Sequence, residues 1–191
     1  MTQSTPTSEA EVITTAKSLL RNGAFAEAET LLAPAIEAGS AKAADLLGIA
    51  HEIGSGTPKN LALATDYYRV ARDRGNALGT YHYGLALYKQ SAFAEAFAVL
   101  ATIAEVNPSA AYWAFRCALI LPDMGENSAE ATRYLTLAAR TGHLGARVKI
   151  ARQYLRGQNG RLKAPLGYLL IARAFLSGLR ALKRGDKQRL Y

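Results

Sequence analysis

The side chains that most often carry out chemistry are few in this sequence and lie far apart. Its three histidines, His51, His82 and His143, have no second histidine four residues away, so they lack the spacing of a helical metal site. Cys117 is the only cysteine, which excludes an internal disulfide, fits a reducing compartment and predicts a small buried apolar residue. We therefore expect no metal centre, and we expect each histidine to be structural or solvated.

Two further patterns could suggest catalysis, and neither has the required context. Gly54-Ser55-Gly56 lacks the spacing and the lysine of a phosphate-binding loop, and it follows a predicted helix rather than a strand. Glu27 and Glu29 lie at a helix start, and Asp123 and Glu126 flank a glycine turn, with no enclosed pocket predicted that would shift their pKa values. The sequence therefore predicts a protein that is not an enzyme and uses no cofactor.

The strongest organising feature is a period marked by glycine. Gly39 and Gly75 are 36 residues apart, as are Gly142 and Gly178, and Asn107 divides the remaining gap of 67 residues into 32 and 35. Glycine and asparagine are the residues that end helices in a left-handed conformation, so we expect Asn107 to hold that place in the third unit. A period of this size is typical of stacked helix pairs that share one core.

Small and large apolar residues recur at fixed distances from these five residues. Four and eight places after them come Ala43 and Leu47, Gly79 and Tyr83, Ala111 and Phe115, and Ala146 and Ile150, and nine places after them come Gly48, Gly84, Arg116 and Ala151. Eight and four places before them come Leu31 and Ala35, Tyr67 and Ala71, Val99 and Ile103, Tyr134 and Ala138, and Leu170 and Ala174. These spacings predict one packed stripe on each of two helices per unit.

The period predicts about five helix pairs, at residues 9–38, 40–74, 76–106, 108–141 and 143–177. The segment Ala24–Ala28 (AFAEA) recurs as Ala92–Ala96, 68 residues later, which equals two units. Alternating strand patterns are almost absent. We therefore expect an all-α fold, an α-solenoid that winds as a right-handed superhelix of about five antiparallel helix pairs.

Local signals predict helix starts and domain limits. Ser8 and Glu11 have the spacing of a capping box, and Asn60 and Ser128 are expected to cap second helices. The expected organisation is a disordered N-terminus at 1–8, one repeat domain at 9–178 and a basic C-terminal tail at 179–191. Residues 1–7 have no apolar signal core, and no stretch reaches the roughly 20 apolar residues of a membrane span, so we expect a cytoplasmic protein.

The residues from Ala43 to Gly75 resemble a known repeat. They read A-x-x-x-L-G-x-x-H-x-x-G-x-G, then a turn, then Y-x-x-x-A-x-x-x-G, which is similar to a Sel-one-like repeat, a relative of the tetratricopeptide repeat. Leu144 to Gly178 resembles it too, and the two AFAEA units look more like tetratricopeptide repeats. The resemblance implies a scaffold that assembles other proteins. Two departures, Arg116 at a small position and Asn107-Pro108 in place of glycine, predict altered packing and superhelix geometry there.

Charge is distributed unevenly about a net value of +8. Residues 1–139 carry 10 Lys/Arg and 14 Asp/Glu, whereas residues 140–191 carry 13 Lys/Arg and a single acidic residue, Asp186. The predicted basic patch comprises Arg147, Lys149, Arg156, Arg180, Lys183, Arg184, Lys187 and Arg189. Such a patch suits an acidic protein surface, an anionic membrane leaflet or nucleic acid. The simpler interpretation is that these cations complement the dipole of the last helix and keep it soluble.

A groove can be predicted from the first helix of each pair, because positions three, six, ten and thirteen after each period residue share a face beside the packed stripe. The predicted partner-binding residues on this face are Asp45, Ile49, Glu52, Tyr81, Leu85, Tyr88, Trp113 and Arg152. Tyrosine and tryptophan are common interface anchors, so we expect a peptide or helix of a partner protein to dock here. In a tightly wound superhelix the same residues would instead be buried between units.

Two functions from different classes remain after these exclusions. The preferred one is a non-catalytic scaffold or adaptor that binds a protein segment in its groove. The alternative is a peripheral membrane adaptor, because the helix predicted from Pro165 to Leu182 is apolar on most sides and is followed by basic residues. Binding of nucleic acid is a weaker alternative, since few aromatic residues accompany the basic end. The identity of the partner and the oligomeric state do not follow from the sequence.

Overall fold

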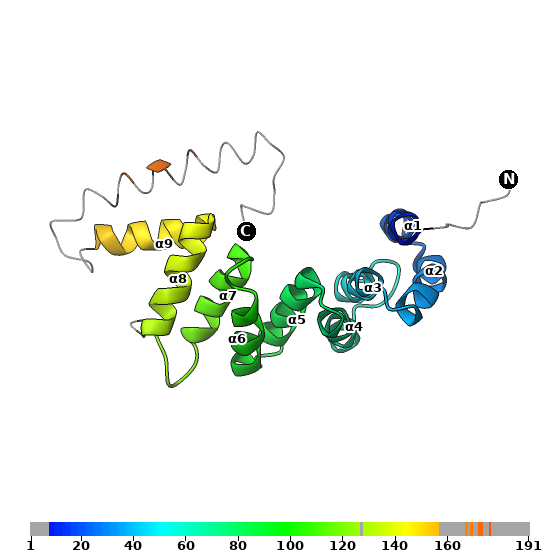
Figure 1. Cartoon of the computed structure of the whole chain (residues 1–191), viewed down its shortest axis with the longest axis horizontal. Coiled ribbons are helices and arrows are strands. Elements are labelled where there is room, and N and C mark those ends of the chain that lie inside the picture. The colour runs from blue at the N-terminus through cyan, green and yellow to red at the C-terminus, as the bar shows by residue number, and fades with distance from the viewer. Residues whose placement is uncertain are drawn as a thin grey trace. The chain divides into compact units, whose positions relative to one another are not determined.

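The computed structural model describes residues 8–126 and 128–156, together with Gly167, Leu169, Ala172, Arg173 and Leu176 (Figure 1). All regular structure in this part of the chain is helical. Its helices are α1 (Glu9–Arg21), α2 (Phe25–Glu37), α3 (Ala41–Ile53), α4 (Leu61–Asp73), α5 (Ala77–Lys89), α6 (Phe93–Thr102), α7 (Pro108–Ala118), α8 (Ala129–Thr141) and α9 (Leu144–Leu155). The prediction of an all-α fold is confirmed. Residues 1–7, Gly178, the tail 179–191 and most of the second helix of the fifth pair lie outside the described residues.

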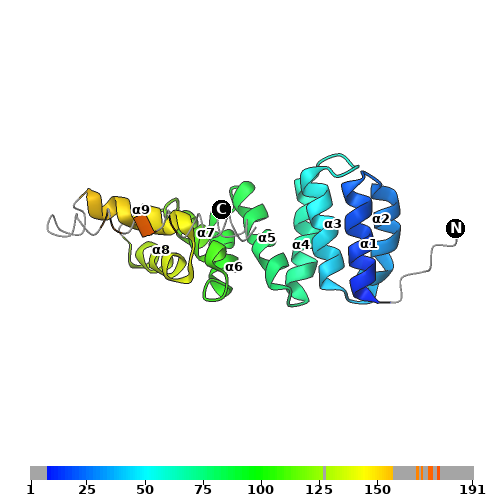
Figure 2. The same cartoon turned by 90° about the horizontal axis from the view of Figure 1, so that it is seen from above.

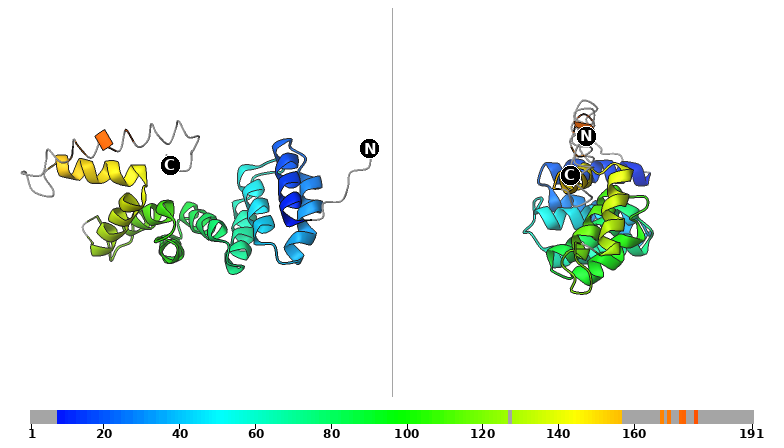
Figure 3. Two further views of the ribbon diagram at one scale, coloured as in Figure 1. Left: turned by 45° about the horizontal axis from the view of Figure 1, so that its top comes forward. Right: turned by 90° about the vertical axis from the view of Figure 1, so that its left-hand side faces the viewer.

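The chain divides into two compact units, residues 1–92 and residues 93–191. In the first unit each helix from α1 to α5 packs on the next, and α3 also contacts α1 and α5. Figures 2 and 3 show α1, α2, α3 and α4 lying side by side. In the second unit α6, α7, α8 and α9 also pack in chain order. Packing between sequential helices is the nearest-neighbour arrangement of a solenoid.

Three of the period glycines end helices as predicted. Gly39, Gly75 and Gly142 have φ values of +96°, +78° and +114°, which favour a residue without a Cβ. The residue after each of them caps the following helix, and the caps are Ser40, Asn76 and His143. These three caps were not predicted from the sequence.

Asn107 does not end a helix, and that prediction is wrong. Its φ is −121°, and its side chain caps α7 by accepting hydrogen bonds from the Ser109 and Ala110 amides at 3.0 and 3.1 Å. The reason is Pro108, because a proline disfavours helical conformation in the preceding residue and is itself suited to the first helical position. Asn107 therefore corresponds to Asn76 rather than to Gly75.

Burial supports this shift of one residue. Counted from the caps Asn76 and Asn107, the same six positions are buried in both helices: Gly79, Thr80, Tyr83, Gly84, Ala86 and Leu87 in α5, and Ala110, Ala111, Ala114, Phe115, Cys117 and Ala118 in α7. Arg116 thus corresponds to Leu85, a half-buried position, and not to the small residue Gly84. In the same way Tyr112 corresponds to Tyr81. The expectation that Arg116 disturbs a packed position is therefore wrong.

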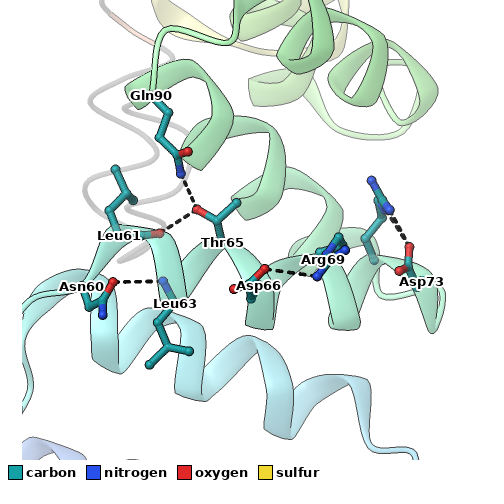
Figure 4. Close-up of polar contacts among 9 residues, drawn as sticks. Asn60, Leu61, Leu63, Thr65, Asp66, Arg69, Asp73 and Gln90 are labelled. Atoms are coloured by element: carbon teal, nitrogen blue, oxygen red, sulfur yellow. Dashed lines mark hydrogen bonds and ion pairs between the residues drawn. The ribbon is translucent and has the colours of Figure 1, made fainter.

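The other predicted caps are confirmed. Ser8 and Glu11 form both hydrogen bonds of the capping box at the start of α1. Asn60 accepts from the Leu63 amide at 3.0 Å, as Figure 4 shows, and Ser128 accepts from the Ala131 amide at 3.0 Å. These bonds satisfy amides that a helix start otherwise leaves without partners.

The second helices bury a stripe that lies beside the predicted one. Its members are an alanine and a larger residue four places later: Ala28 and Leu32, Ala64 and Tyr68, Ala96 and Leu100, and Ala131 and Leu135. The predicted large residues Leu31, Tyr67 and Val99 are only half-buried, whereas Tyr134 is buried as predicted. A shift of one residue matters because it rotates a side chain by about 100° around the helix.

Helix α4 lies very close to both of its neighbours. A Cβ placed at Gly48 of α3 would lie 2.6 Å from ring atoms of Tyr68, and one at Gly79 of α5 would collide with the Cβ of Ala71. Tyr68 is fully buried, and its hydroxyl donates to Glu52 at 2.6 Å. The outer side of α4 is polar, with the ion pair between Asp66 and Arg69 drawn in Figure 4.

The long turn between α3 and α4 packs on the preceding pair. Gly54 and Gly56 both have positive φ, and the Ser55 hydroxyl donates to the Leu20 carbonyl at 2.6 Å. A Cβ at Gly56 would collide with the carbonyl of Gly23. The Gly-Ser-Gly segment is therefore an inter-helix turn, as predicted, and its second glycine is required by the close approach of another backbone.

His51 is part of the core beside this turn. It is 6% exposed, with its ring between Phe25 at 5.0 Å and Tyr67 at 5.6 Å between ring centroids. Burial lowers the pKa of His51 below its usual 6.5, and the nearby Glu29 opposes this effect only in part. His51 is therefore a structural histidine, which is one of the two roles expected for it.

The contact between Gly79 and Ala71 predicts a rescue by exchange. Gly79→Ala should destabilise the protein by about 1–2 kcal/mol through overpacking, although alanine favours helix by about 1 kcal/mol. Ala71→Gly should also destabilise it, because it leaves a void and weakens α4. The double variant moves the methyl group across the same contact and should recover most of the stability lost in Gly79→Ala. Urea denaturation followed by far-UV circular dichroism measures this, and strictly additive losses would contradict the contact.

The lowered pKa of His51 predicts a pH dependence of stability. As pH falls from about 7 to about 5, the unfolded chain binds a proton near pH 6.5 that folded His51 resists, so the free energy of unfolding decreases. His51→Phe retains an aromatic ring and removes this effect, so its stability relative to wild type should increase toward low pH. Denaturation curves at pH 7, 6 and 5 test this expectation. A difference between variant and wild type that does not change with pH would contradict it.

Candidate binding surfaces

The first candidate surface is a row of side chains on α5, which we call the α5 stripe. It consists of Leu78, Tyr81, Leu85 and Tyr88, whose spacing of three, four and three residues places them on one helix face. Leu78 is 45% exposed, and the other three are half-buried. The stripe thus presents two tyrosines and two leucines, of which three were predicted groove residues.

The predicted acidic residues of α3 contribute to packing between helices. Asp45 is 5% exposed, and its carboxylate lies 2.6 Å from Nδ1 of His82 on α5. Glu52 accepts hydrogen bonds from Tyr68 of α4 and Lys89 of α5. Burial alone would raise the pKa of Glu52, but the hydrogen bonds from Lys89 and Tyr68 outweigh it and lower the pKa.

Of the three predicted groove residues of α3, Asp45 and Glu52 thus form polar contacts between helices, and Ile49 does not. Ile49 is half-buried. The two carboxylates of α3 therefore hold α3, α4 and α5 together, and the first unit does not present them as an acidic groove.

The second candidate surface is a pocket of about 480 Å³ in the second unit, which we call the basic pocket. It is lined by Tyr112 of α7, Glu126 of the turn before α8, and Leu144, Gly145, Val148, Lys149, Arg152, Gln153 and Arg156 of α9 and its C-cap. Arg152 was a predicted groove residue, and Gly145 and Val148 occupy the same predicted face of this helix. Tyr112 was not predicted, because the register of α7 was misplaced by one residue.

One wall of the basic pocket is an aromatic stack. The rings of Tyr112 and His143 lie 4.1 Å apart between centroids and 15° from parallel. Nδ1 of His143 accepts a hydrogen bond from the Ala146 amide at 3.2 Å, which caps α9. A Cβ at Gly145 would lie 3.2 Å from the His143 ring, so glycine allows the stack to form. His143 therefore has a structural role at the edge of the pocket.

The charged residues of α9 have different partners. Nε of Arg147 donates to the Ala139 carbonyl near the end of α8 at 2.9 Å. Lys149 forms an ion pair with Glu126 at 2.9 Å and lowers the pKa of that carboxyl group. Arg152 and Arg156 are exposed. The other predicted basic residues, Arg180, Lys183, Arg184, Lys187 and Arg189, lie outside the described residues.

Trp113 is half-buried next to the pocket but does not line it. Its ring lies 6.5 Å from that of Tyr112, and the Arg116 guanidinium lies 5.2 Å from the centre of the Trp113 ring. The signal that could have identified Tyr112 is Asn107-Pro108, read as a cap followed by a first helical residue rather than as a helix end.

The described residues contain few other features that could bind ligands. Among them, no three His, Cys, Asp or Glu side chains are placed to hold a metal ion. Cys117 is buried, and burial raises its thiol pKa to about 11. A pocket of about 660 Å³ lies between α1 and α2, with Val12, Leu31 and Pro34 among its lining residues. Within the described part of the chain, no helix is both long and apolar enough to cross a membrane.

Comparisons with known proteins find similarity in structure and none in sequence. No protein-family model and no curated protein matches the sequence. A Sel1 repeat protein from Oxalobacter formigenes superposes with a TM-score of 0.67 at 20% identity, covering 94% of this chain and 78% of that one. PilF from Pseudomonas aeruginosa superposes with a TM-score of 0.62 at 22% identity, covering 94% and 86%.

A third structure has the same repeat fold. The protective antigen c5321 of uropathogenic Escherichia coli, which displays an SLR fold, superposes with a TM-score of 0.67 at 20% identity. The match covers 86% of this chain, which spans only 38% of the antigen chain. Superpositions of this quality at such low identity establish a shared fold, and they carry no information about the activity of this chain. The chain therefore has the fold of the Sel1-like repeat proteins, an all-α solenoid of stacked helices.

Proposed function

We propose that this protein is a non-catalytic interaction scaffold that binds a segment of a partner protein along the faces of its first helices. The observation that carries this proposal is the α5 stripe, in which Tyr81, Leu85 and Tyr88 stand half-buried in one row. Aromatic residues that are partly buried before binding lose little conformational freedom when a partner covers them. The spacing suits an extended segment or an amphipathic helix.

The distribution of polar groups supports a binding role rather than a catalytic one. The buried acidic residue Asp45 is paired with His82, and Glu52 is paired with Lys89 and Tyr68. Groups paired in this way connect neighbouring helices, which suits a structural role for them in a scaffold. The same helix face in the second unit contributes Val148 and Arg152 to the basic pocket, so both units present this face.

A second candidate function is binding to a membrane surface through the helix predicted at Pro165–Leu182. Most of that helix lies outside the described residues. Of those described, Leu169, Ala172, Arg173 and Leu176 are exposed and share one helix face, and both leucines are about half exposed at 51% and 52%. Exposed leucines on a helix followed by basic residues favour adsorption to an anionic leaflet.

The scaffold proposal predicts the effect of truncating the α5 stripe. Tyr81→Ala and Tyr88→Ala, tested separately, should each weaken recovery of a specific partner by about tenfold or more, as expected for interface anchors. The measurement is quantitative affinity purification from native lysate, with far-UV circular dichroism to verify folding. Ile53→Ala and Val106→Ala are matched controls, because both remove exposed apolar side chains elsewhere. Equal recovery by all four variants would contradict the proposal.

The membrane candidate predicts co-sedimentation with vesicles that contain phosphatidylserine at low ionic strength. Leu169→Gln/Leu176→Gln should reduce the bound fraction several-fold, because it removes the apolar side chains that enter the interface. Neutral phosphatidylcholine vesicles serve as the control and should bind weakly. If wild-type protein stays in the supernatant with anionic vesicles, the membrane candidate is wrong.

A further inference from the structure

We propose that the basic pocket is a docking site for an acidic polypeptide segment whose carboxylates pair with Arg152 and Arg156. This inference deepens the proposed scaffold function and rests on it, since it names the chemistry of the partner at one of the two candidate surfaces.

Two cations of the pocket are left for a ligand. Residues 140–156 contain Arg140, Arg147, Lys149, Arg152 and Arg156 and no acidic residue. Arg147 is used at the end of α8, and Lys149 is paired with Glu126. Arg152 and Arg156 line the pocket, are exposed, and form no ion pair within 4.0 Å among the residues that the structure describes. Arg156 lies near enough to Glu126 to help lower the pKa of that carboxyl group.

The spacing of these two arginines suits carboxylates. They are four residues apart at the end of one helix, so they lie side by side at about 5–6 Å between Cβ atoms. Each planar guanidinium can bind a carboxylate through two parallel hydrogen bonds. A segment with two acidic side chains on the same side of its backbone, as at alternate positions of an extended chain, can engage both arginines together.

The rest of the pocket wall favours a polypeptide over other anions. Glu126 and Gln153 lie among the cations, so the wall offers acceptors that the backbone amides of a peptide can donate to. Glu126 repels both kinds of anion, but a polyphosphate has no donor that could offset this repulsion, whereas a peptide has its backbone amides. The ring of Tyr112 is stacked on His143, so that face is not available to a nucleic-acid base. Val148 adds an apolar contact, and a pocket of about 480 Å³ can hold a short segment.

The test measures binding of a defined probe to the full chain at low ionic strength. The probe is a fluorescein-labelled peptide of alternating glutamate and glycine, and the same peptide with glutamine in place of glutamate is the reference. Fluorescence anisotropy should show binding of the glutamate peptide only. Arg152→Gln/Arg156→Gln should weaken it about tenfold or more, because two charge-assisted hydrogen-bonded pairs are lost.

A gain-of-function variant guards against loss of binding through misfolding. Glu126→Gln keeps a side-chain acceptor but removes the negative charge of the pocket and releases Lys149, so it should strengthen peptide binding several-fold. Trp113 is the only tryptophan and lies next to Tyr112, so its intrinsic fluorescence should change when an unlabelled glutamate peptide enters the pocket. A peptide bound elsewhere on the chain would leave this signal unchanged.

The matched control is Lys183→Gln/Arg184→Gln, which removes the same charge from the basic C-terminal tail predicted at 179–191 and should change affinity less than twofold. Loss of binding in this control, with full binding by Arg152→Gln/Arg156→Gln, would overturn the inference. It would also be overturned if a 12-nucleotide single-stranded DNA, phosphatidylserine vesicles or inorganic phosphate bound through Arg152 and Arg156 more tightly than the peptide. The scaffold function would survive either result, because its test depends on Tyr81 and Tyr88 and not on the acidic probe.

Discussion

The first unit depends on how closely the backbone of α4 approaches the helices on either side. Gly48 on α3 and Gly79 on α5 leave no room for a Cβ against Tyr68 and Ala71. This approach buries Tyr68 completely and brings its hydroxyl to Glu52. It also brings α3 and α5 near enough for Asp45 to contact His82. Apolar contacts and polar contacts thus join α3, α4 and α5, and both kinds of contact depend on Gly48 and Gly79.

The same geometry determines which side chains remain for binding. Helices α3 and α7 each pack against the helix before them and the helix after them, so each buries residues on two sides and keeps one face partly open. On α5 this face carries Tyr81, Leu85 and Tyr88, and on α9 it carries Val148 and Arg152. Because each helix presents the same positions, substitutions there change the chemistry of the surface without changing the fold.

The carboxylates of α3 are paired with residues of other helices, and two buried histidines stack on tyrosines. The buried Asp45 carboxylate contacts His82, and the half-buried Glu52 carboxylate accepts hydrogen bonds from Tyr68 and Lys89, so both contacts join different helices. His143 and His51 are placed by ring stacking on Tyr112 and Tyr67. An unpaired buried charge costs several kcal/mol, so a buried carboxylate needs a partner. Groups that are paired inside the protein are no longer available to bind a ligand at the surface. Arg152 and Arg156 differ from these groups because both are exposed and form no ion pair within 4.0 Å among the described residues.

Local sequence signals determined the helical class, the left-handed glycines at 39, 75 and 142, and the caps Ser8, Asn60 and Ser128, because each depends on residues a few places apart. The repeat period followed from the recurrence of such signals along the chain. Local signals also contain the register of α7, because Asn107-Pro108 is typical of a cap and a first helical residue, and an error of one residue, which rotates a side chain by about 100°, exchanged Tyr112 for Trp113. Only the tertiary structure decided that Tyr112 lines a pocket. It also decided that Asp45 and Glu52 pair with α5, since those partners lie 37 residues away along the chain. Pairing across such distances depends on how helices pack, which periodicity within one helix does not encode.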